Sequence, residues 1–212
     1  MTQKTPDSWF DRLLEHPVEL DKFMALRDDF DDYSVLVFQE FYFKALLPKL
    51  LAGADKHNKK NGRGLRVRPV SPDKLLEVKG GLKIVSAGGW PKKFHVFLQS
   101  AEVDCSLFRA GAWLGSAPGD EGGTAAGLFA SRLAERLGGC EPRPNGWKFV
   151  YSGLPDTDWN SRGTFGAIAA DIRALRGGER AVLPEAGRYV DALMDIVKIT
   201  DEVALETLGN DG

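Results

Sequence analysis

The sequence predicts an α+β fold: a mainly antiparallel sheet of about four to six strands, with helices from the N- and C-terminal parts of the chain packed on it. Two observations indicate this fold. Residues 82–114 read as consecutive strands with short links, and segments with helical periodicity lie on both sides of them. Strands that follow one another closely pair as an antiparallel meander, and the apolar face of such a sheet needs a layer of helices over it.

The first strand of the central meander is predicted from the alternation of its side chains. In residues 82–87, Leu82 and Ile84 alternate with Lys83, which is the pattern of a half-buried strand. Residues 88–93 (GGWPKK) then have the composition of an open hairpin loop.

The second and third strands show the same alternation. In residues 94–99, one face carries Phe94, Val96 and Leu98, and the other carries His95, Phe97 and Gln99. In residues 105–114, one face carries Leu107, Arg109, Gly111 and Trp113, and the other carries Phe108, Ala110 and Ala112. Each strand therefore has one face that is more apolar than the other.

The remaining elements follow from helical periodicity and from turn residues. Apolar residues at helical spacing predict helices over residues 9–15, 17–29, 34–51, 124–137, 164–175 and 184–208. Short apolar runs predict strands over residues 65–70 and 147–151, and Pro69 assigns the first of these to an edge of the sheet. Residues 75–79 fit either a strand or a helical turn that begins at Ser71.

We expect these elements to form one domain, residues 1–212, without a linker or an internal repeat. Its expected parts are a helical N-terminal part (1–52), a basic loop (53–64), a sheet (65–115) and a mixed part (116–212) that ends in a long helix. The loop is predicted because GADKHNKKNGRG is polar and is bounded by glycines.

Composition limits the class of protein. The chain has 43% hydrophobic and 27% charged residues, which are the values of an ordinary globular domain. Cys105 and Cys140 have no partner spacing, which favours a reducing compartment. The sequence shows no N-terminal apolar run after a basic start, so it indicates no signal peptide. It indicates no membrane span either, because Glu40 and Lys44 interrupt its most apolar helix. We therefore expect a cytoplasmic protein with no membrane partner.

The charges are strongly segregated along the chain. Residues 56–93 hold eleven Lys or Arg and only two Asp or Glu. Residues 1–55 hold six basic and eleven acidic residues, and residues 94–212 hold eleven basic and seventeen acidic residues. A basic block in an otherwise acidic chain indicates an anionic partner.

The basic block predicts a binding segment for nucleic acid or another polyanion. Lysine and arginine neutralise phosphates and release counterions, which gives affinity without sequence readout. A tryptophan near them would offer a plane on which an unpaired base stacks. The candidate binding residues are Lys56, Lys59, Lys60, Arg63, Arg66, Arg68, Trp90, Lys92 and Lys93.

A second motif, Glu77-Val78-Lys79, resembles the acid-x-lysine motif of PD-(D/E)xK nucleases. On a strand, the two-residue period would place Glu77 and Lys79 on the same face, beside a scissile phosphate. The resemblance implies Mg²⁺-dependent cleavage, with Asp73 or Asp55 as a second metal ligand. Only three residues separate Asp73 from Glu77, whereas in the family this aspartate lies many residues earlier on a preceding strand.

The sequence thus leaves three functions open. The first is a non-enzymatic binding or accessory module without metal or cofactor, which engages nucleic acid or another polyanion as a subunit of a larger bacterial assembly. The second is the Mg²⁺-dependent nuclease. The third is an adaptor that binds an acidic protein surface through the same cations. We expect the first, because a three-residue motif is a weak signal.

Overall fold

The structure is a computed structural model that describes residues 30–75, 77, 79–100, 108–115, 125–154, 158–159, 161–179 and 183–209. The helices predicted over residues 9–15 and 17–29 lie outside the described residues. The chain divides into two compact units, residues 1–37 and 38–212, and the second contains all of the sheet. The expectation of one domain across the whole chain stays a prediction.

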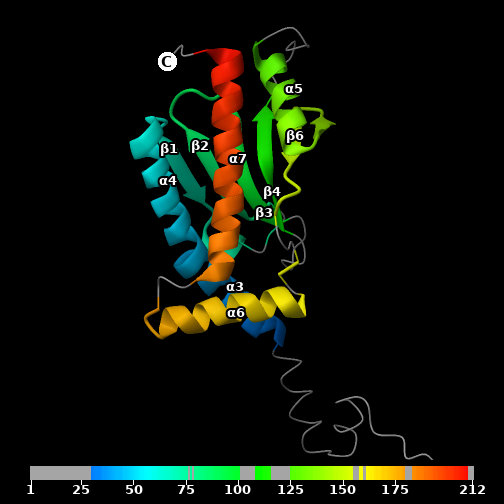
Figure 1. Ribbon diagram of the computed structural model, residues 1–212. Helices are drawn as coiled ribbons and strands as arrows, with labels where there is room; N and C mark the ends of the chain where they lie inside the picture. The colour runs from blue at the N-terminus through cyan, green and yellow to red at the C-terminus, as the bar shows by residue number, and fades with distance from the viewer. Residues whose placement is uncertain are drawn as a thin grey trace, which may run out of the picture. The chain divides into compact units, whose positions relative to one another are not determined.

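The described residues combine helices with a single open sheet, which confirms the α+β prediction (Figure 1). The helices are α3 (Phe30–Glu40), the π-helix η1 (Phe41–Leu46), α4 (Leu47–Asn61), the 3-10 turn η2 (Pro72–Lys74), α5 (Ala125–Leu137), α6 (Arg162–Arg176) and α7 (Pro184–Leu208). The strands are β1 (Leu65–Pro69), β2 (Gly81–Ser86), β3 (Phe94–Ser100), β4 (Phe108–Gly115), β5 (Cys140–Arg143) and β6 (Gly146–Val150). None of the described helices is long and apolar enough to cross a membrane.

All strand pairs of the sheet are antiparallel, in the order β1-β2-β3-β4-β6-β5. The central three strands form the predicted meander, and its register pairs Leu82 with Leu98 and Leu98 with Ala110. β1 lies at one edge, as Pro69 predicts. At the other edge lies β5, which we did not predict because its sequence, CEPR, contains Pro142 and no apolar alternation.

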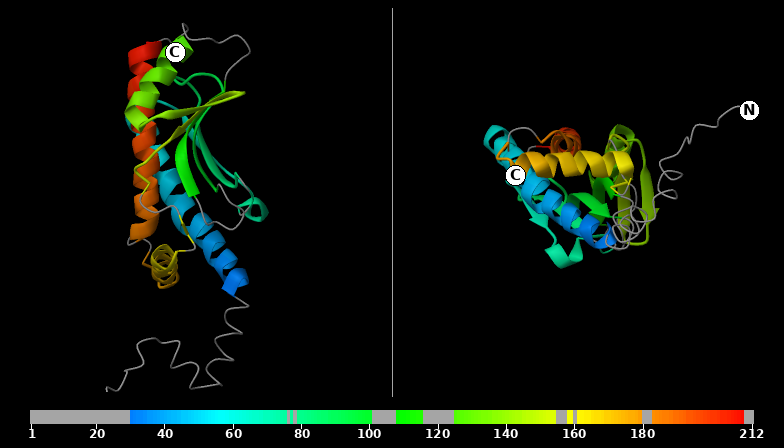
Figure 2. Two further views of the ribbon diagram at one scale, coloured as in Figure 1. Left: turned by 90° about the vertical axis from the view of Figure 1, so that its right-hand side faces the viewer. Right: turned by 90° about the horizontal axis from the view of Figure 1, so that it is seen from below.

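Helices α4, α5 and α7 cover one face of the sheet (Figure 2). Alternate side chains point into this helical layer. Ile84, Val96, Ala112 and Phe149 lie opposite one another on four neighbouring strands, and all of them are fully buried. Because most of the buried residues of α7 are apolar as well, removal of these surfaces from water is the main stabilisation of this unit.

The predicted loop over residues 53–64 is wrong over most of its length, because α4 continues through it. Leu50, Ala54 and His57 recur at helical spacing and are buried. Burial of one side of the helix therefore outweighs the polar composition of the segment. The helix ends at Gly62, which adopts the left-handed conformation (φ 68°) that favours glycine at a helix C-terminus.

An aromatic cluster fills the core near α6. The Trp159 ring is fully buried and stacks on Phe108, with 3.9 Å between the ring centres. Phe38 and Phe41 contact the same indole, and its Nε1 donates a hydrogen bond of 2.8 Å to the Tyr189 hydroxyl. Trp159 therefore closes the core rather than lining a surface for a partner.

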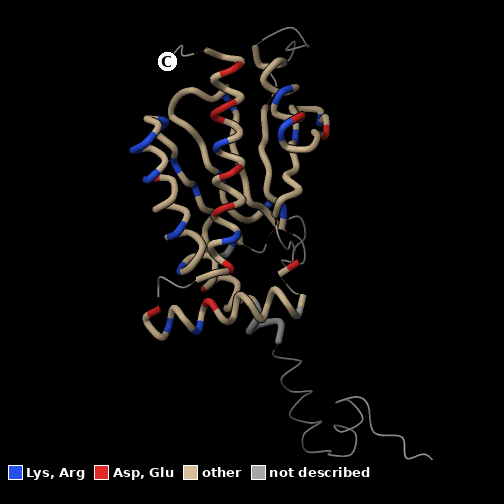
Figure 3. The backbone as a smooth tube through the Cα atoms, in the orientation of Figure 1, with Lys and Arg blue, Asp and Glu red and all other residues tan. Residues whose placement is uncertain are grey.

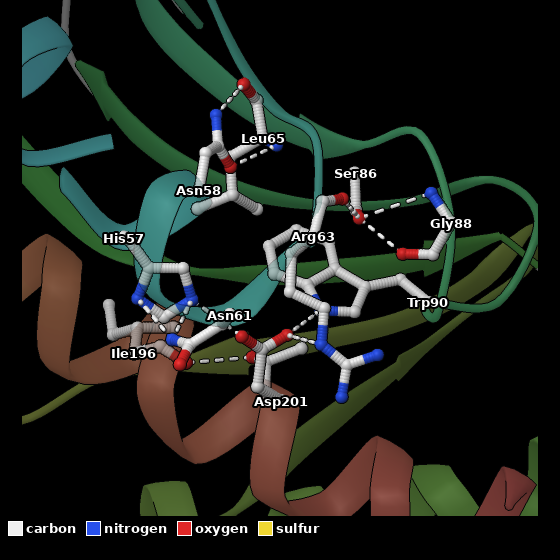
Figure 4. A network of polar contacts seen from close by, with 11 residues as sticks. His57, Asn58, Asn61, Arg63, Leu65, Ser86, Gly88, Trp90, Ile196 and Asp201 are labelled. Carbon is white, nitrogen blue, oxygen red and sulfur yellow. Dashed lines mark hydrogen bonds and ion pairs between the residues drawn. The ribbon is translucent and has the colours of Figure 1, made fainter. Parts of the chain in front are cut away.

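A buried carboxylate, Asp201 of α7, joins α4 to the loop between β2 and β3 (Figure 4). It is 7% exposed, and its Oδ2 lies 2.6 Å from Nε2 of His57. Its Oδ1 accepts a hydrogen bond of 2.6 Å from Trp90 Nε1 and lies 3.5 Å from Arg63 Nε. The amide nitrogen of Asn61 contacts the imidazole as well. One side chain thus holds groups from three parts of the chain.

We predict that Asp201→Ala lowers the free energy of unfolding by about 3–5 kcal/mol, because it leaves the imidazole, guanidinium and indole groups of the network without their shared acceptor. Urea unfolding measures the change. The control is Asp195→Ala on the same helix, which removes an exposed ion pair with Lys198 and should cost no more than about 1 kcal/mol. Equal losses in the two variants would contradict a structural role for the Asp201 network.

Candidate functional site

The face of the sheet that α4, α5 and α7 leave uncovered, here called the open face, carries cations on most of its strands. Because side chains alternate, the register that buries Ile84 and Val96 turns Lys83 and Phe97 to the open face. The strand pairs extend this assignment across the sheet. The basic residues of the open face are Arg66 and Arg68 of β1, Lys83 of β2, Arg109 of β4, Lys148 of β6 and Arg143 of β5.

A hollow of about 610 Å³ lies in the open face. Among the described residues that line it there are five lysines and arginines and no Asp or Glu: Lys79, Lys83, Arg109, Arg143 and Lys148. The other lining residues are aromatic or neutral: His95, Phe97, Gln99, Ser100, Trp113, Pro144 and Asn145. The hollow therefore combines positive charge with flat apolar surface.

The register of the sheet places like charges next to one another. Arg68 of β1 is the Cα partner of Lys83 on β2, and two cations directly opposite each other destabilise a strand pair. On β5, Glu141 faces Lys148 across the strand pair, and its carboxylate forms an ion pair with Arg143. A bound anion would relieve the remaining repulsion between the cations.

Burial and neighbouring cations change the ionisation of two groups in the hollow. Burial lowers the pKa of Lys148, and the nearby Arg109 guanidinium lowers it further. Burial, together with the charge of Lys83, lowers the pKa of His95 to about 4. His95 is therefore neutral near pH 7, where its two ring nitrogens offer one hydrogen-bond donor and one acceptor.

Phe97 forms the floor of the hollow. Its ring is 2% exposed, and the Lys148 ammonium lies 5.9 Å from its centre. The His95 ring lies beside it, with 6.4 Å between centres. Gly111, its partner on β4, is needed here, because a Cβ at that position would lie 3.1 Å from Phe97 Cζ and 1.9 Å from the Phe149 carbonyl oxygen. The glycine lets the phenyl ring lie close to the backbone of β4.

Lys79 reaches the hollow from a strained backbone position. Its φ of 69° lies in the left-handed region, which costs a non-glycine residue about 1–2 kcal/mol. Its backbone N–H donates a hydrogen bond of 2.9 Å to the Ser100 carbonyl oxygen, which fixes the segment beside β3. A lysine at a position suited to glycine is a conformational cost, and repulsion between Lys79 and Lys148 in the hollow adds to it.

The predicted binding residues fall into separate groups. Arg66 and Arg68 lie on the open face, next to the cations of the hollow. Lys56, Lys59 and Lys60 are exposed on α4, which packs beside β1 at the edge of the sheet. The structure thus brings the two arginines to the open face and leaves the three lysines on a helix, where their role in binding stays a prediction.

The other predicted binding residues lie around the loop between β2 and β3. Arg63 and Trp90 both contact Asp201, and the indole also packs edge-on against Phe94, with 5.2 Å between ring centres. These contacts hold the partly buried Trp90 indole against the protein, and its role in stacking on a base stays a prediction. Lys92 and Lys93 are exposed in the same loop, and their binding role is likewise a prediction.

The strand needed for the nuclease motif is absent from the described residues. Residues 72–74 form a helical turn, η2, and neither Glu77 nor Lys79 belongs to a strand. Asp73 lies in that turn, whereas Asp55 is exposed on α4. In the part of the chain that the structure describes, no three His, Cys, Asp or Glu side chains are grouped to hold a metal ion. The two-residue geometry that supported the motif is therefore wrong.

The outer side of α7 has the opposite charge to the open face. Figure 3 shows acidic positions along α7 and basic positions along α4. The acidic residues on the outer side of α7 are Asp191, Asp195, Glu202 and Glu206. Cations of the same helical layer pair with three of these acids: Lys198 with Asp195, and Arg136 with Glu202 and Glu206.

None of the five cations of the hollow was among the predicted binding residues; Lys79 had been named only in the nuclease motif, and the other four, Lys83, Arg109, Arg143 and Lys148, in neither hypothesis. Two of these cations, Lys83 and Arg109, already stood on the less apolar faces of predicted strands. A search for cations at those alternate positions would have found them. Their grouping depends on the register of several strands, which together bring Lys83 and Lys148, 65 positions apart in the sequence, to the same hollow.

Comparison with known proteins adds no assignment: no family model matches this chain, and no significant match was found among curated proteins or solved structures.

We predict that His95→Gln reduces the loss of stability between pH 6.5 and pH 4. Over this range an unfolded histidine (pKa 6.5) takes up a proton, whereas folded His95, with a pKa of about 4, stays neutral. Protonation therefore favours the unfolded state, so the free energy of unfolding falls as the pH falls and this contribution levels off below pH 4.

Urea unfolding of the wild type and of His95→Gln at several pH values between 4 and 6.5 measures this difference. Comparison of the two proteins cancels the contribution of the carboxylates, which are common to both. The same pH dependence in both proteins would show that burial does not hold His95 neutral.

Proposed function

We propose that the protein is a non-enzymatic binding module that engages nucleic acid or another polyanion through the open face of its sheet. The observation that carries this proposal is the hollow, which five cations surround and which no described Asp or Glu lines. Glu141 pairs with Arg143 at the edge of the sheet, and the remaining excess of cations on the open face favours a ligand that brings negative charge.

The spread of the cations favours a chain of anions over a single anion. Neighbouring strands lie about 4.8 Å apart, so Arg68 on β1 and Lys148 on β6 are separated by four strand spacings, about 19 Å. One phosphate cannot reach both ends of this surface. A polyanion would contact several cations at once, and each contact would release a counterion.

The sheet gives these cations fixed positions. Lys83, Arg109 and Lys148 come from three strands that are held in register by the hydrogen bonds of the sheet. A ligand that binds them would order only their side-chain ends, because the backbone is already fixed.

The salt dependence of binding tests this proposal. We predict that Lys83→Gln, Arg109→Gln and Lys148→Gln, combined in one variant, weaken binding to a fluorescein-labelled oligothymidine. The slope of log K against log salt should decrease by about 2 units in magnitude, since each phosphate contact with a single strand contributes about 0.7. Fluorescence polarisation across a salt series gives this slope.

Two matched variants complete the design. Arg132→Gln removes an exposed cation of α5, on the helical side, and should leave the slope unchanged. Lys56→Gln, Lys59→Gln and Lys60→Gln, combined, remove the same number of charges from α4. If the α4 variant lost the slope and the open-face variant kept it, the open face would not be the binding surface.

A further inference from the structure

We infer that the hollow is a binding site for an unpaired base of single-stranded nucleic acid, with the neighbouring phosphates of the strand on the cations around it. This inference rests on the proposed function and names the ligand of the same face. It follows from the size of the hollow, from the flat groups that line it, and from the neutral polar groups among its cations.

The volume of the hollow suits a group larger than a phosphate. About 610 Å³ lies within the range of sites that hold small organic ligands, which is roughly 300–1,000 Å³. A lone phosphate or a carboxylate would leave most of this space unfilled. A base with its sugar and phosphate fills such a site and places charge only at one side of it.

The walls provide planar surface. Trp113 of β4 lies beside His95 of β3 as its Cα partner, and both side chains are partly exposed in the hollow. Stacking of bases on aromatic side chains is the usual means by which proteins hold single strands. A ligand made only of anionic groups would make no use of these rings.

The polar groups of the hollow are of two kinds. Gln99 and Asn145 carry neutral amides, and His95 is neutral near pH 7 because burial lowers its pKa. These groups match the donors and acceptors on the edge of a base, whereas the cations match phosphates. The Lys148 ammonium lies 5.9 Å from the centre of the Phe97 ring, and from this position it would contact the phosphate of a nucleotide bound in the hollow.

A duplex does not fit this arrangement. In a duplex the faces of the bases are stacked on one another, so only phosphates, sugars and base edges would reach the open face. The planar groups of the hollow would then contribute nothing, and a duplex would bind through the cations alone. A preference for single strands with bases over any ligand without them therefore identifies the site.

The experiment compares two single strands that have the same charge and differ in their bases, and adds a duplex, which has a higher charge density. A labelled fifteen-residue oligothymidine is compared by fluorescence polarisation with an abasic strand of the same length and with a duplex. We expect the oligothymidine to bind about tenfold more tightly than the abasic strand at equal salt, because stacking contributes to each bound base.

Substitution of Trp113 tests which ring holds the base. Trp113→Leu should remove the preference for oligothymidine and leave the affinity for the abasic strand unchanged, whereas Trp113→Tyr should retain most of the preference. The matched control is Trp147→Leu on β6, whose side chain lies on the opposite face of the sheet. Circular dichroism confirms that each variant is folded.

The outcomes separate the two proposals. Equal binding of oligothymidine and the abasic strand would overturn the base site and leave the polyanion module in place. Binding of none of these probes at low salt would overturn both. A preference that survives Trp113→Leu but is lost in Trp147→Leu would also overturn the site.

Discussion

A strand presents its side chains alternately to two faces, and in this sheet α4, α5 and α7 cover only one of them. This constraint determines the rest of the structure. The register that buries Ile84, Val96, Ala112 and Phe149 leaves the intervening positions on the open face. The hydrophobic side fixes the register, and the register then fixes where the cations lie. The core and the candidate site are therefore two consequences of the same pairing.

Several features of the open face lower the stability of the folded protein. Arg68 lies opposite Lys83, Lys79 occupies a left-handed position, and the pKa of Lys148 is lowered by burial and by Arg109. Each feature costs free energy in the absence of a ligand. The buried network around Asp201 lies on the helical side and has its partners within the chain. The charges of the Asp201 network therefore stabilise the fold, whereas the cations of the open face remain available to a ligand.

The sequence was sufficient for the architecture because alternation and helical periodicity are local signals. It failed for α4, where the polar composition of residues 53–64 concealed the helical spacing of Leu50, Ala54 and His57. It also failed for β5, whose four exposed residues carry no periodic signal. The cations of the hollow were not predicted as binding residues, because their proximity depends on pairing between distant strands. Arg66 and Arg68, which lie on the open face outside the hollow, were predicted, since they stand close together in one basic segment.

The most direct test of the account is an NMR titration that follows the indole N–H signals of the five tryptophans during addition of oligothymidine. If the open face is the binding surface, the Trp113 signal should shift first and most. The signals of Trp90 and Trp159 should stay in place, because both indoles donate hydrogen bonds inside the protein. Movement of Trp90 with no change at Trp113 would contradict the account, because it would place the ligand at the loop between β2 and β3.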